Sequence, residues 1–168
     1  MVFKISCLLF FKNSLEEILL IQRTRSPNQG LWSPPGGKLI LDSGESPFEC
    51  AIRETKEEIG LVVTENEFSL FGYVSEKNYQ GNHWLMFLFE YLKPLNKLPE
   101  EIEEGGFSFF SRSQIDLLKI PHTDHQLVWP FYDKRSAGFW GVRADCSLNK
   151  ADLVVEANPA FCNKAESL

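Results

Sequence analysis

The sequence lacks an excess of positive charge. Its 168 residues include 17 Lys and Arg against 23 Asp and Glu, which gives a formal net charge of −6. Sequence-independent binding to a nucleic-acid backbone needs clustered Lys and Arg, so this composition argues against a nucleic-acid partner. A small anionic ligand would need a bridging cation in such a protein.

The sequence also lacks patterned cysteines and long hydrophobic runs. Its four cysteines, Cys7, Cys50, Cys146 and Cys162, form no Cys-x-x-Cys pair and no Cys/His ligand spacing. Neither a zinc site nor a disulfide scaffold is indicated, and reduced thiols are expected. No stretch reaches about 18 apolar residues, and the apolar run Val2–Phe11 has no small-residue cleavage signal. We therefore expect a soluble, cytoplasmic protein without membrane association.

Internal repeats, linkers and low-complexity blocks are absent, and 43% of the residues are hydrophobic, so one compact domain is expected. Turn residues and hydrophobic alternation predict a mixed α/β domain with strands on both sides of a central helix. The first two strands, 3–11 and 18–23, are expected to form a hairpin, whereas the weakly patterned residues 150–168 are expected to form a mobile tail. The other predicted strands are 68–74, 83–92, 107–110 and 138–143, and the predicted helices are 46–60, 111–118 and 123–134.

The clearest predicted helix begins at Ser46 and ends at Gly60. Ser46 is a favoured N-cap, Pro47 suits the first helical position, and glycine commonly ends a helix. At about 100° per residue, one face of this helix is suited to packing on a sheet. That face consists of Phe48, Ala51, Ile52, Thr55 and Ile59.

The opposite face of the same helix carries Glu54, Glu57 and Glu58. Like charges at these spacings destabilise an isolated helix by about 0.2–0.5 kcal/mol per pair, and the helix dipole disfavours anions near the C-terminal end. Local stability therefore does not explain the cluster. A divalent cation does, because Mg²⁺ binds carboxylate oxygens and completes its shell with water and phosphate. The alternative is an ordinary solvated acidic face.

The residues around this cluster resemble the Nudix box, G-x5-E-x7-R-E-U-x-E-E-x-G-U, where U is aliphatic. The matching residues are Gly37, Glu45, Arg53, Glu54, Glu57, Glu58, Gly60 and Leu61. Two departures occur. Thr55 replaces the usual aliphatic residue, although its methyl can pack inward and its hydroxyl can bond back within the helix. Seven residues, rather than five, separate Gly37 from Glu45, and a loop can absorb them at little cost.

The resemblance implies a Nudix fold, in which helices pack on both sides of a mixed sheet. It covers about residues 3–134, so we assign a Nudix domain to 1–145 and a C-terminal extension to 146–168. It also implies hydrolysis of a nucleoside diphosphate linked to another group, with Mg²⁺ or Mn²⁺ held by the Gly37 carbonyl, Glu54, Glu57 and Glu58. Arg53 would orient a glutamate by a bidentate contact. Glu45 would either reach the cluster through water or cap the helix.

The resemblance further implies a general base, either a box glutamate or one from a later loop. In the acidic loop before the strand 107–110, Glu103 matches best and Glu104 is the alternative, although the loop could simply be an acidic surface. Trp32 and Phe71 could stack a nucleobase, or they could be core residues. Asp124 falls where MutT-like members of the family read an oxidised purine, and it also suits a helix N-cap.

The leading prediction is a nucleoside triphosphate pyrophosphohydrolase that releases a nucleoside monophosphate and pyrophosphate, with oxidised purines as a plausible substrate. Its expected partner is a small nucleotide, and the expected assembly is a monomer or homodimer. One alternative is cleavage of dinucleoside polyphosphates, because Tyr79 lies close to where those members of the family place a tyrosine. Another is a Nudix-fold module that senses a nucleotide without hydrolysing it.

Overall fold

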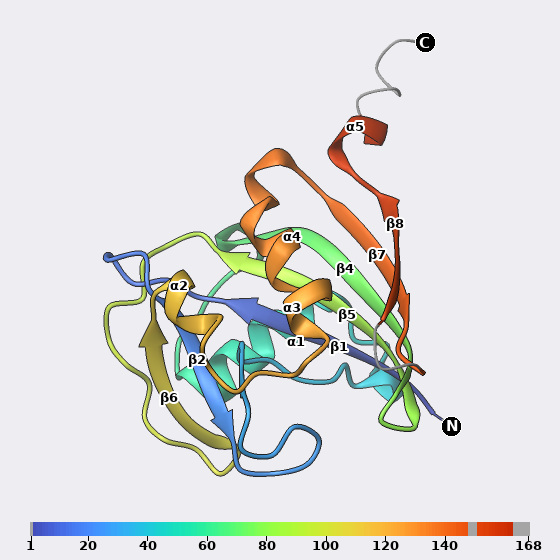
Figure 1. The fold of residues 1–168 in the computed structure, drawn as a ribbon. Helices are drawn as coiled ribbons and strands as arrows, with labels where there is room; N and C mark the ends of the chain where they lie inside the picture. The colour runs from blue at the N-terminus through green and yellow to red at the C-terminus, as the bar shows by residue number, and fades with distance from the viewer. Residues whose placement is uncertain (1, 148–150, 163–168) are drawn as a thin grey trace.

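The computed structural model describes residues 2–147 and 151–162. Within them, a five-stranded sheet with strand order β1-β5-β4-β7-β8 packs beside a three-stranded sheet with order β3-β2-β6 (Figure 1). The first sheet is mixed, because β1 runs parallel to β5 and β4 runs parallel to β7, whereas β4 is antiparallel to β5 and β7 is antiparallel to β8. This is the mixed α/β architecture expected from the sequence.

The described residues form mostly strands, with short helices between them. The strands are β1 (Phe3–Phe10), β2 (Ile18–Arg23), β3 (Trp32–Ser33), β4 (Phe68–Tyr79), β5 (Asn82–Tyr91), β6 (Gly105–Phe110), β7 (Trp140–Asp145) and β8 (Asp152–Ala157). The helices are α1 (Pro47–Glu54), a π-helical turn (Thr55–Ile59), α2 (Arg112–Ile115), α3 (Asp124–Leu127), α4 (Trp129–Asp133) and α5 (Pro159–Cys162), with 3₁₀ turns at Leu41–Ser43, Glu65–Glu67 and Arg135–Ala137. No helix among these residues is long and apolar enough to cross a membrane.

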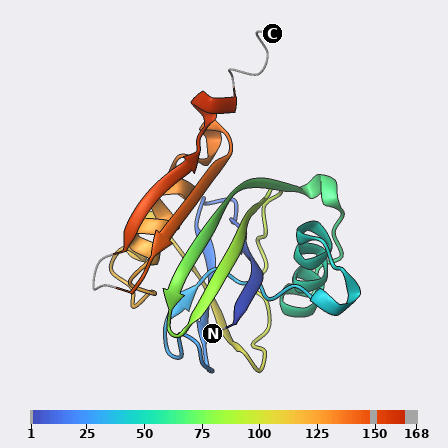
Figure 2. The same ribbon diagram turned by 90° about the vertical axis from the view of Figure 1, so that its right-hand side faces the viewer.

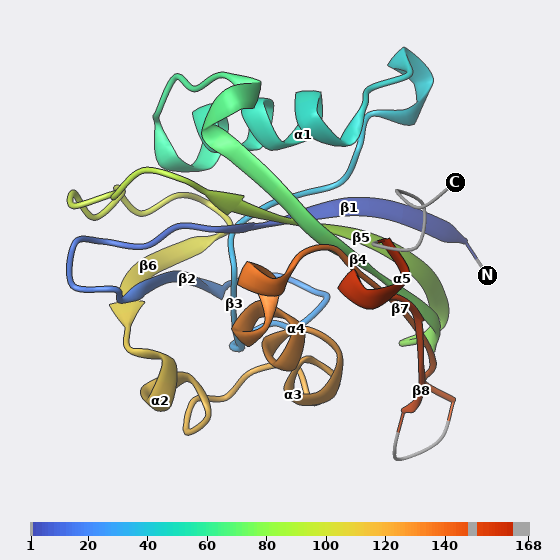
Figure 3. The same ribbon diagram turned by 90° about the horizontal axis from the view of Figure 1, so that it is seen from above.

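Helices cover both faces of the five-stranded sheet. In Figures 2 and 3, α1 lies on one side, and α3 and α4 lie on the other. Alternate residues of each strand therefore enter two separate cores, as the period of two in a strand requires. On β1, Cys7 and Leu9 enter the core beside α1, whereas Phe10 enters the core beside α3 and α4. Helices on both sides of a mixed sheet are what the sequence predicted.

The predicted hairpin of the first two strands is wrong. A turn near Asn13 does reverse the chain, but only one isolated bridge, Lys12 to Ile18, joins the two segments. Strand β1 instead pairs with β5 in parallel over its whole length, and β2 pairs with β6 and β3 in the other sheet. Distant partners therefore determine the pairing of these strands, and sequence neighbours do not.

The free edge of β1 is covered by the loop that contains the two adjacent glycines. The Cys7 N–H donates to the Gly37 carbonyl at 2.9 Å, and the Leu9 N–H donates to the Pro35 carbonyl at 2.8 Å. An edge strand exposes unpaired backbone groups unless another segment satisfies them. Covering the edge in this way places Gly36 and Gly37 against α1.

The structure corrects two expectations in the C-terminal half. The predicted helix 123–134 is two helices, α3 and α4, and Pro130 at the start of α4 cannot donate a backbone hydrogen bond to α3. Residues 152–157, expected within a mobile tail, form β8 and pair antiparallel with β7. The expectation for residues 148–150 and 163–168 lies outside the described residues.

Candidate active site

The acidic helix begins and ends where the sequence predicted. The Ser46 side chain accepts a hydrogen bond from the Glu49 N–H, and the Glu49 carboxylate accepts one from the Ser46 N–H at 2.7 Å, which completes a capping box. Gly60 ends the helical segment with a φ of 73°, a left-handed conformation that glycine adopts without strain. Both ends of the helix are therefore fixed by local sequence.

Within this segment, the α-helix changes to a π-helical turn at Thr55. The Gly60 N–H donates to the Thr55 carbonyl, five residues earlier, and the Thr55 hydroxyl donates to the Ala51 carbonyl at 2.7 Å. Thr55 is fully buried, so its replacement of an aliphatic residue is accommodated as expected. A π-turn changes the angle between successive side chains, and such turns are frequent at functional sites.

The turn separates the three glutamates. Glu54 and Glu58 line a pocket that also contains Gly36 and Gly37, whereas Glu57 lies outside the lining of that pocket and exposes 57% of its side chain. Glu57 instead accepts a hydrogen bond from Arg53 Nη1 at 3.0 Å. Two carboxylates are thus directed into one cavity, and the third is held at its rim by an arginine.

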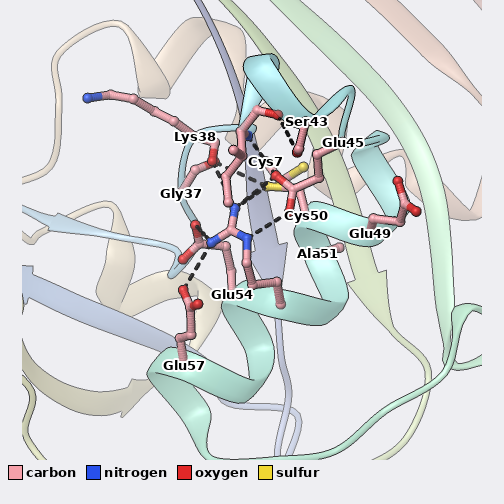
Figure 4. Close-up of polar contacts among 12 residues, drawn as sticks. Cys7, Gly37, Lys38, Ser43, Glu45, Glu49, Cys50, Ala51, Glu54 and Glu57 are labelled. Atoms are coloured by element: carbon pink, nitrogen blue, oxygen red, sulfur yellow. Dashed lines mark hydrogen bonds and ion pairs between the residues drawn. The ribbon is translucent and has the colours of Figure 1, made fainter.

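Arg53 connects the glutamates to each other and to the loop before the helix (Figure 4). Its Nε and Nη2 donate to the two oxygens of Glu45 at 2.7 and 3.0 Å, and its Nη1 donates to Glu54 Oε1 at 2.7 Å. Its Nη2 also donates to the Lys38 carbonyl at 2.9 Å. Glu45 therefore neither caps the helix nor enters the pocket, because its carboxylate holds Arg53.

The two adjacent glycines bring backbone directly against the carboxylates. The Gly36 N–H donates to Glu58 Oε2 at 2.8 Å. A Cβ at Gly37 would lie 2.1 Å from Glu54 Oε1, so any side chain there would displace the carboxylate. The two extra residues before Glu45 are absorbed by the Leu41–Ser43 turn and Gly44, whose φ is 71°. The insertion therefore leaves Gly37 beside the helix.

The carboxylates in the pocket are held in an environment that disfavours their charge. The pKa of Glu58 is raised to about 7, chiefly by burial and also by the neighbouring Glu54 carboxylate, while the hydrogen bond from Gly36 opposes the shift. Burial also raises the pKa of Glu54, whereas Arg53 lowers it. A nearby positive charge would stabilise the ionised form of both carboxyls and so lower their pKa values.

The donor set suits a magnesium-like ion. Mg²⁺ takes one or two carboxylates and completes its octahedron with waters and substrate phosphates. Glu54 and Glu58 supply two carboxylates beside Gly37, whose carbonyl accepts hydrogen bonds from the Cys7 N–H at 2.9 Å and, more weakly, from Cys50 Sγ at 3.7 Å. In the part of the chain that the structure describes, no three His, Cys, Asp or Glu side chains are grouped closely enough to hold a metal without further ligands.

The pocket has a volume of about 390 Å³ and joins the carboxylates of α1 to the start of α3. Glu54 and Glu58 line one part of it, and Asp124 lines another. Two cationic side chains, Arg23 and Lys38, also line it. A pocket of this size matches a small-molecule site, and its cations complement an anionic ligand.

Not all predicted site residues reach this pocket. Glu103 forms an ion pair with Arg25 outside the pocket lining, whereas its neighbour Glu104 lines the pocket. Phe71 is 3% exposed and packs against Phe10 and Tyr132, so its ring has no face open to a base. Trp32 packs edge-on against Phe110, with ring centroids 4.8 Å apart, and does not line the pocket.

Sequence reasoning missed several pocket residues. Trp84, Met86 and Glu76 project from the five-stranded sheet, and Arg23 lies at the end of β2. Glu76 could have been found by extending the predicted strand 68–74, because it lies two residues beyond the apolar Val74 and so on the same face of the strand. The predicted dinucleoside marker, Tyr79, does line the pocket, and its hydroxyl donates to Asn28 Oδ1 at 2.8 Å.

Comparison with known proteins identifies relatives of this chain. The sequence profile of the NUDIX domain family matches residues 3–131. The mRNA-decapping enzyme subunit 2 of Saccharomyces cerevisiae is 40% identical over 82 residues, but the match covers 46% of this chain and only 7% of that protein. The putative 8-oxo-dGTP diphosphatase of Bacillus subtilis is 28% identical over 115 residues, which are 68% of this chain and 71% of that protein.

A solved structure shares the whole fold. The MutT protein from Bacillus halodurans superposes with a TM-score of 0.70 at 21% sequence identity, and the match covers 93% of this chain and 99% of that one. At this level of identity, the similarity concerns the fold alone.

Proposed function

Because the chain belongs to the Nudix hydrolase family, we propose that it is a pyrophosphohydrolase of nucleoside triphosphates, which releases a nucleoside monophosphate and pyrophosphate. The observation that carries this proposal is that one pocket joins two helix-borne carboxylates to a buried, polar end. A nucleotide has two corresponding parts: a phosphate chain, which a metal ion at the carboxylate end would bind, and a base, which the buried polar end would bind. We further propose that purine nucleotides, including oxidised ones, are the substrates, as the name of the B. subtilis relative suggests for that protein.

Each residue of the phosphate end has a proposed task. Glu54 and Glu58, with the Gly37 carbonyl, would hold Mg²⁺ or Mn²⁺, and Glu57 would join them from the rim. When bound, such an ion neutralises phosphate charge and lowers the pKa of a coordinated water. Arg53 orients Glu54 and Glu57 from behind and does not line the pocket.

The remaining polar residues of the pocket complement this chemistry. Arg23 and Lys38 line it and would neutralise phosphate oxygens that the metal does not contact. Glu104 lines the pocket close enough to Glu58 to raise its pKa, so Glu104 is our preferred general base. Glu103, the residue favoured by spacing, is engaged with Arg25. The base must lie within reach of the attacking water, and only Glu104 of these two faces the pocket.

Purified protein incubated with Mg²⁺ and a panel of nucleotides tests the proposal. We expect nucleoside monophosphate and pyrophosphate from at least one purine nucleoside triphosphate. Glu58→Gln should lower kcat/KM by about 100-fold or more, because it removes a proposed metal ligand. Glu65→Gln, which changes an exposed acidic residue away from the metal ligands, should leave kcat/KM unchanged.

The products and the variants separate the alternatives. Full activity of Glu58→Gln would overturn the metal assignment. Release of two nucleotides from dinucleoside polyphosphates, with triphosphates untouched, would favour the alternative in which Tyr79 contributes to substrate recognition. No product from any nucleotide would favour a sensing module.

A further inference from the structure

The loop between β2 and β3 forms one wall of the pocket. Arg23 ends β2, and Pro27 and Asn28 of the loop line the pocket with it. The two ends of the loop are joined by backbone hydrogen bonds: the Arg23 N–H donates to the Leu31 carbonyl at 3.0 Å, and the Gly30 N–H donates to the Arg23 carbonyl at 2.7 Å. These bonds fix the base of the loop, whereas its tip needs other contacts to hold it in place.

The Arg23 side chain is held by this tip. Its Nε donates to the Pro27 carbonyl at 3.1 Å. The contact uses one N–H of the guanidinium, and Nη1 and Nη2 carry the four others. The charge of Arg23 lowers the pKa of Glu58, so the guanidinium lies near the carboxylate end of the pocket. A guanidinium in that place is suited to a bidentate contact with a phosphate group.

Asn28 ties the tip of the loop to the turn between β4 and β5. Its Oδ1 accepts hydrogen bonds from the Tyr79 hydroxyl at 2.8 Å and from Gln80 Nε2 at 3.1 Å. Tyr79 lies 51 positions after Asn28 in the sequence. Asn28 has a φ of 65°, a left-handed conformation that asparagine tolerates better than most residues. Two donors from a distant part of the chain thus converge on one side-chain oxygen.

The Tyr79 hydroxyl is fully engaged by these neighbours. It donates its single proton to Asn28, and it accepts a hydrogen bond from Gln80 Nε2 at 3.1 Å. Tyr79 is 6% exposed, and a buried hydroxyl that lost its partner would be destabilising. The hydroxyl proton is therefore used within the protein, and its contact fixes the side chain of Asn28.

Asn28 directly follows Pro27, so fixing one residue restricts the other. We propose that Tyr79 and Asn28 are positioning residues for Arg23: they hold the loop so that the Pro27 carbonyl directs the guanidinium toward the phosphate chain of the ligand. This inference rests on the proposed function, in which Arg23 neutralises phosphate oxygens. A guanidinium that is already oriented loses less conformational freedom on binding, which strengthens the contact with phosphate.

Calorimetric binding of inorganic pyrophosphate in the presence of Mg²⁺ tests this inference separately from hydrolysis. Arg23→Gln should weaken binding by about tenfold or more, because it removes a charged phosphate ligand. Tyr79→Phe, which removes only the hydroxyl, should weaken binding by about threefold to tenfold. Asn28→Gly should have a similar effect, because glycine keeps the left-handed backbone and lacks the acceptor oxygen.

Double variants separate positioning from other effects. In the Arg23→Gln background, Tyr79→Phe should weaken pyrophosphate binding no further, because the residue through which it acts has been removed. Tyr79→Phe combined with Asn28→Gly should bind as the single variants do. A general loss of structure, or direct contact between Tyr79 and the ligand, would instead weaken binding in the Arg23→Gln background as well, and that result would overturn the inference.

The matched control is Tyr73→Phe. Tyr73 also lies on β4, but its hydroxyl donates to Glu156 on β8 at 2.9 Å, and it is not part of the pocket lining. This variant should bind pyrophosphate as the wild type does. Circular dichroism of all variants establishes that they are folded.

The outcomes distinguish this inference from the proposed function. Absence of pyrophosphate binding by the wild type, or unchanged binding by Tyr79→Phe or Arg23→Gln, would overturn the inference, even if nucleotides are hydrolysed. A loss of binding in Tyr79→Phe that depends on Arg23, without hydrolysis of any nucleoside triphosphate, would support the inference and contradict the proposed function.

Discussion

Arg53 makes a set of hydrogen bonds that a lysine at its position could not make. Its guanidinium contacts Glu45, Glu54, Glu57 and the Lys38 carbonyl at once, through three nitrogens. A planar group with five N–H donors can hold several carboxylates in fixed directions, whereas an ammonium is a single point charge. The position of the Glu54 carboxylate in the pocket therefore depends on a residue outside the pocket.

At the same scale, the buried Glu76 carboxyl makes stability depend on pH. Burial raises its pKa from 4.5 to about 7, and the nearby Thr123 hydroxyl opposes this only in part. Between these two values, the unfolded chain has lost the proton and the folded protein keeps it. Raising the pH through this range therefore favours the unfolded state, by at most roughly 3 kcal/mol for a shift of this size.

We predict that Glu76→Gln becomes more stable relative to the wild type as the pH rises from about 5 to about 8, because glutamine has no proton to lose. Urea unfolding at both pH values measures the change. Glu67→Gln is the control, because Lys93 lowers the pKa of that exposed carboxylate to about 2 and both states are ionised over most of this range. A stability difference between Glu76→Gln and the wild type that is the same at both pH values would contradict the prediction.

At the scale of elements, the π-turn determines which glutamates reach the pocket. Glu54 ends the α-helical part, and Glu57 and Glu58 lie within the turn. In a regular α-helix, each residue advances by about 100°, and a π-turn accommodates one additional residue in the same turn. The directions of Glu57 and Glu58 relative to Glu54 therefore depend on the number of residues in the turn.

Deleting Lys56 tests this dependence. The deletion should restore an uninterrupted α-helix and rotate Glu57 and Glu58 relative to Glu54, because Lys56 is an exposed residue of the turn. We predict that helical content and folding are retained, while hydrolytic activity falls by about 100-fold or more. Lys56→Ala, which keeps the residue count, should retain activity. A fully active deletion variant would show that the turn does not position the carboxylates.

Elements with local signals were predictable, and those with distant partners were not. Ser46, Pro47 and Gly60 act within a few residues of their own positions, and the structure has the helix ends there. The pairing of β1 with β5 places Phe3 beside His83. These residues are far apart in the sequence, so no local pattern predicts the pairing. Over so short a segment, the spacing of apolar residues is the same for a π-turn as for an α-helix. The sequence therefore did not predict the π-turn.

The candidate site was predictable to a similar extent. Glu54 and Glu58 were found because their spacing on a helix can be read from the sequence. The loop that carries Glu103 and Glu104 has no period, so spacing could not decide which residue faces the pocket. Phe71 was assigned to substrate binding on residue type alone, and its surroundings, Phe10 and Tyr132, come from distant parts of the chain.

At the scale of the whole molecule, the residues beyond the family match contribute to the sheet. The NUDIX match ends at residue 131, but β7 and β8 extend the five-stranded sheet past it. Leu153 and Val155 on β8 are partly buried and pack against the core that also contains Trp129 and Val142. Strand β8 therefore adds apolar contacts at one edge, far along the sheet from β1.

We predict that Leu153→Ala and Val155→Ala each reduce the free energy of unfolding by roughly 1–2 kcal/mol, because each removes partly buried methyl and methylene groups. Urea unfolding measures the loss, and kcat/KM for the best nucleotide should remain within about twofold of the wild type. Val154→Ala, on the opposite and more exposed face of the strand, is the control and should have a smaller effect. Equal losses at all three positions would argue against the observed packing of β8.

Strand β4 shifts register between Leu70 and Gly72 where it pairs with β5. Before the shift, Phe68 and Leu70 enter the core beside α1, and after it, Val74 enters the core on the opposite side, although all three have the same parity. One additional residue in a strand exchanges its two faces. The length of β4 at this point is thus as important as its residue types: a variant that lost one residue here could keep every other side chain of β4 and still turn Glu76 away from the pocket.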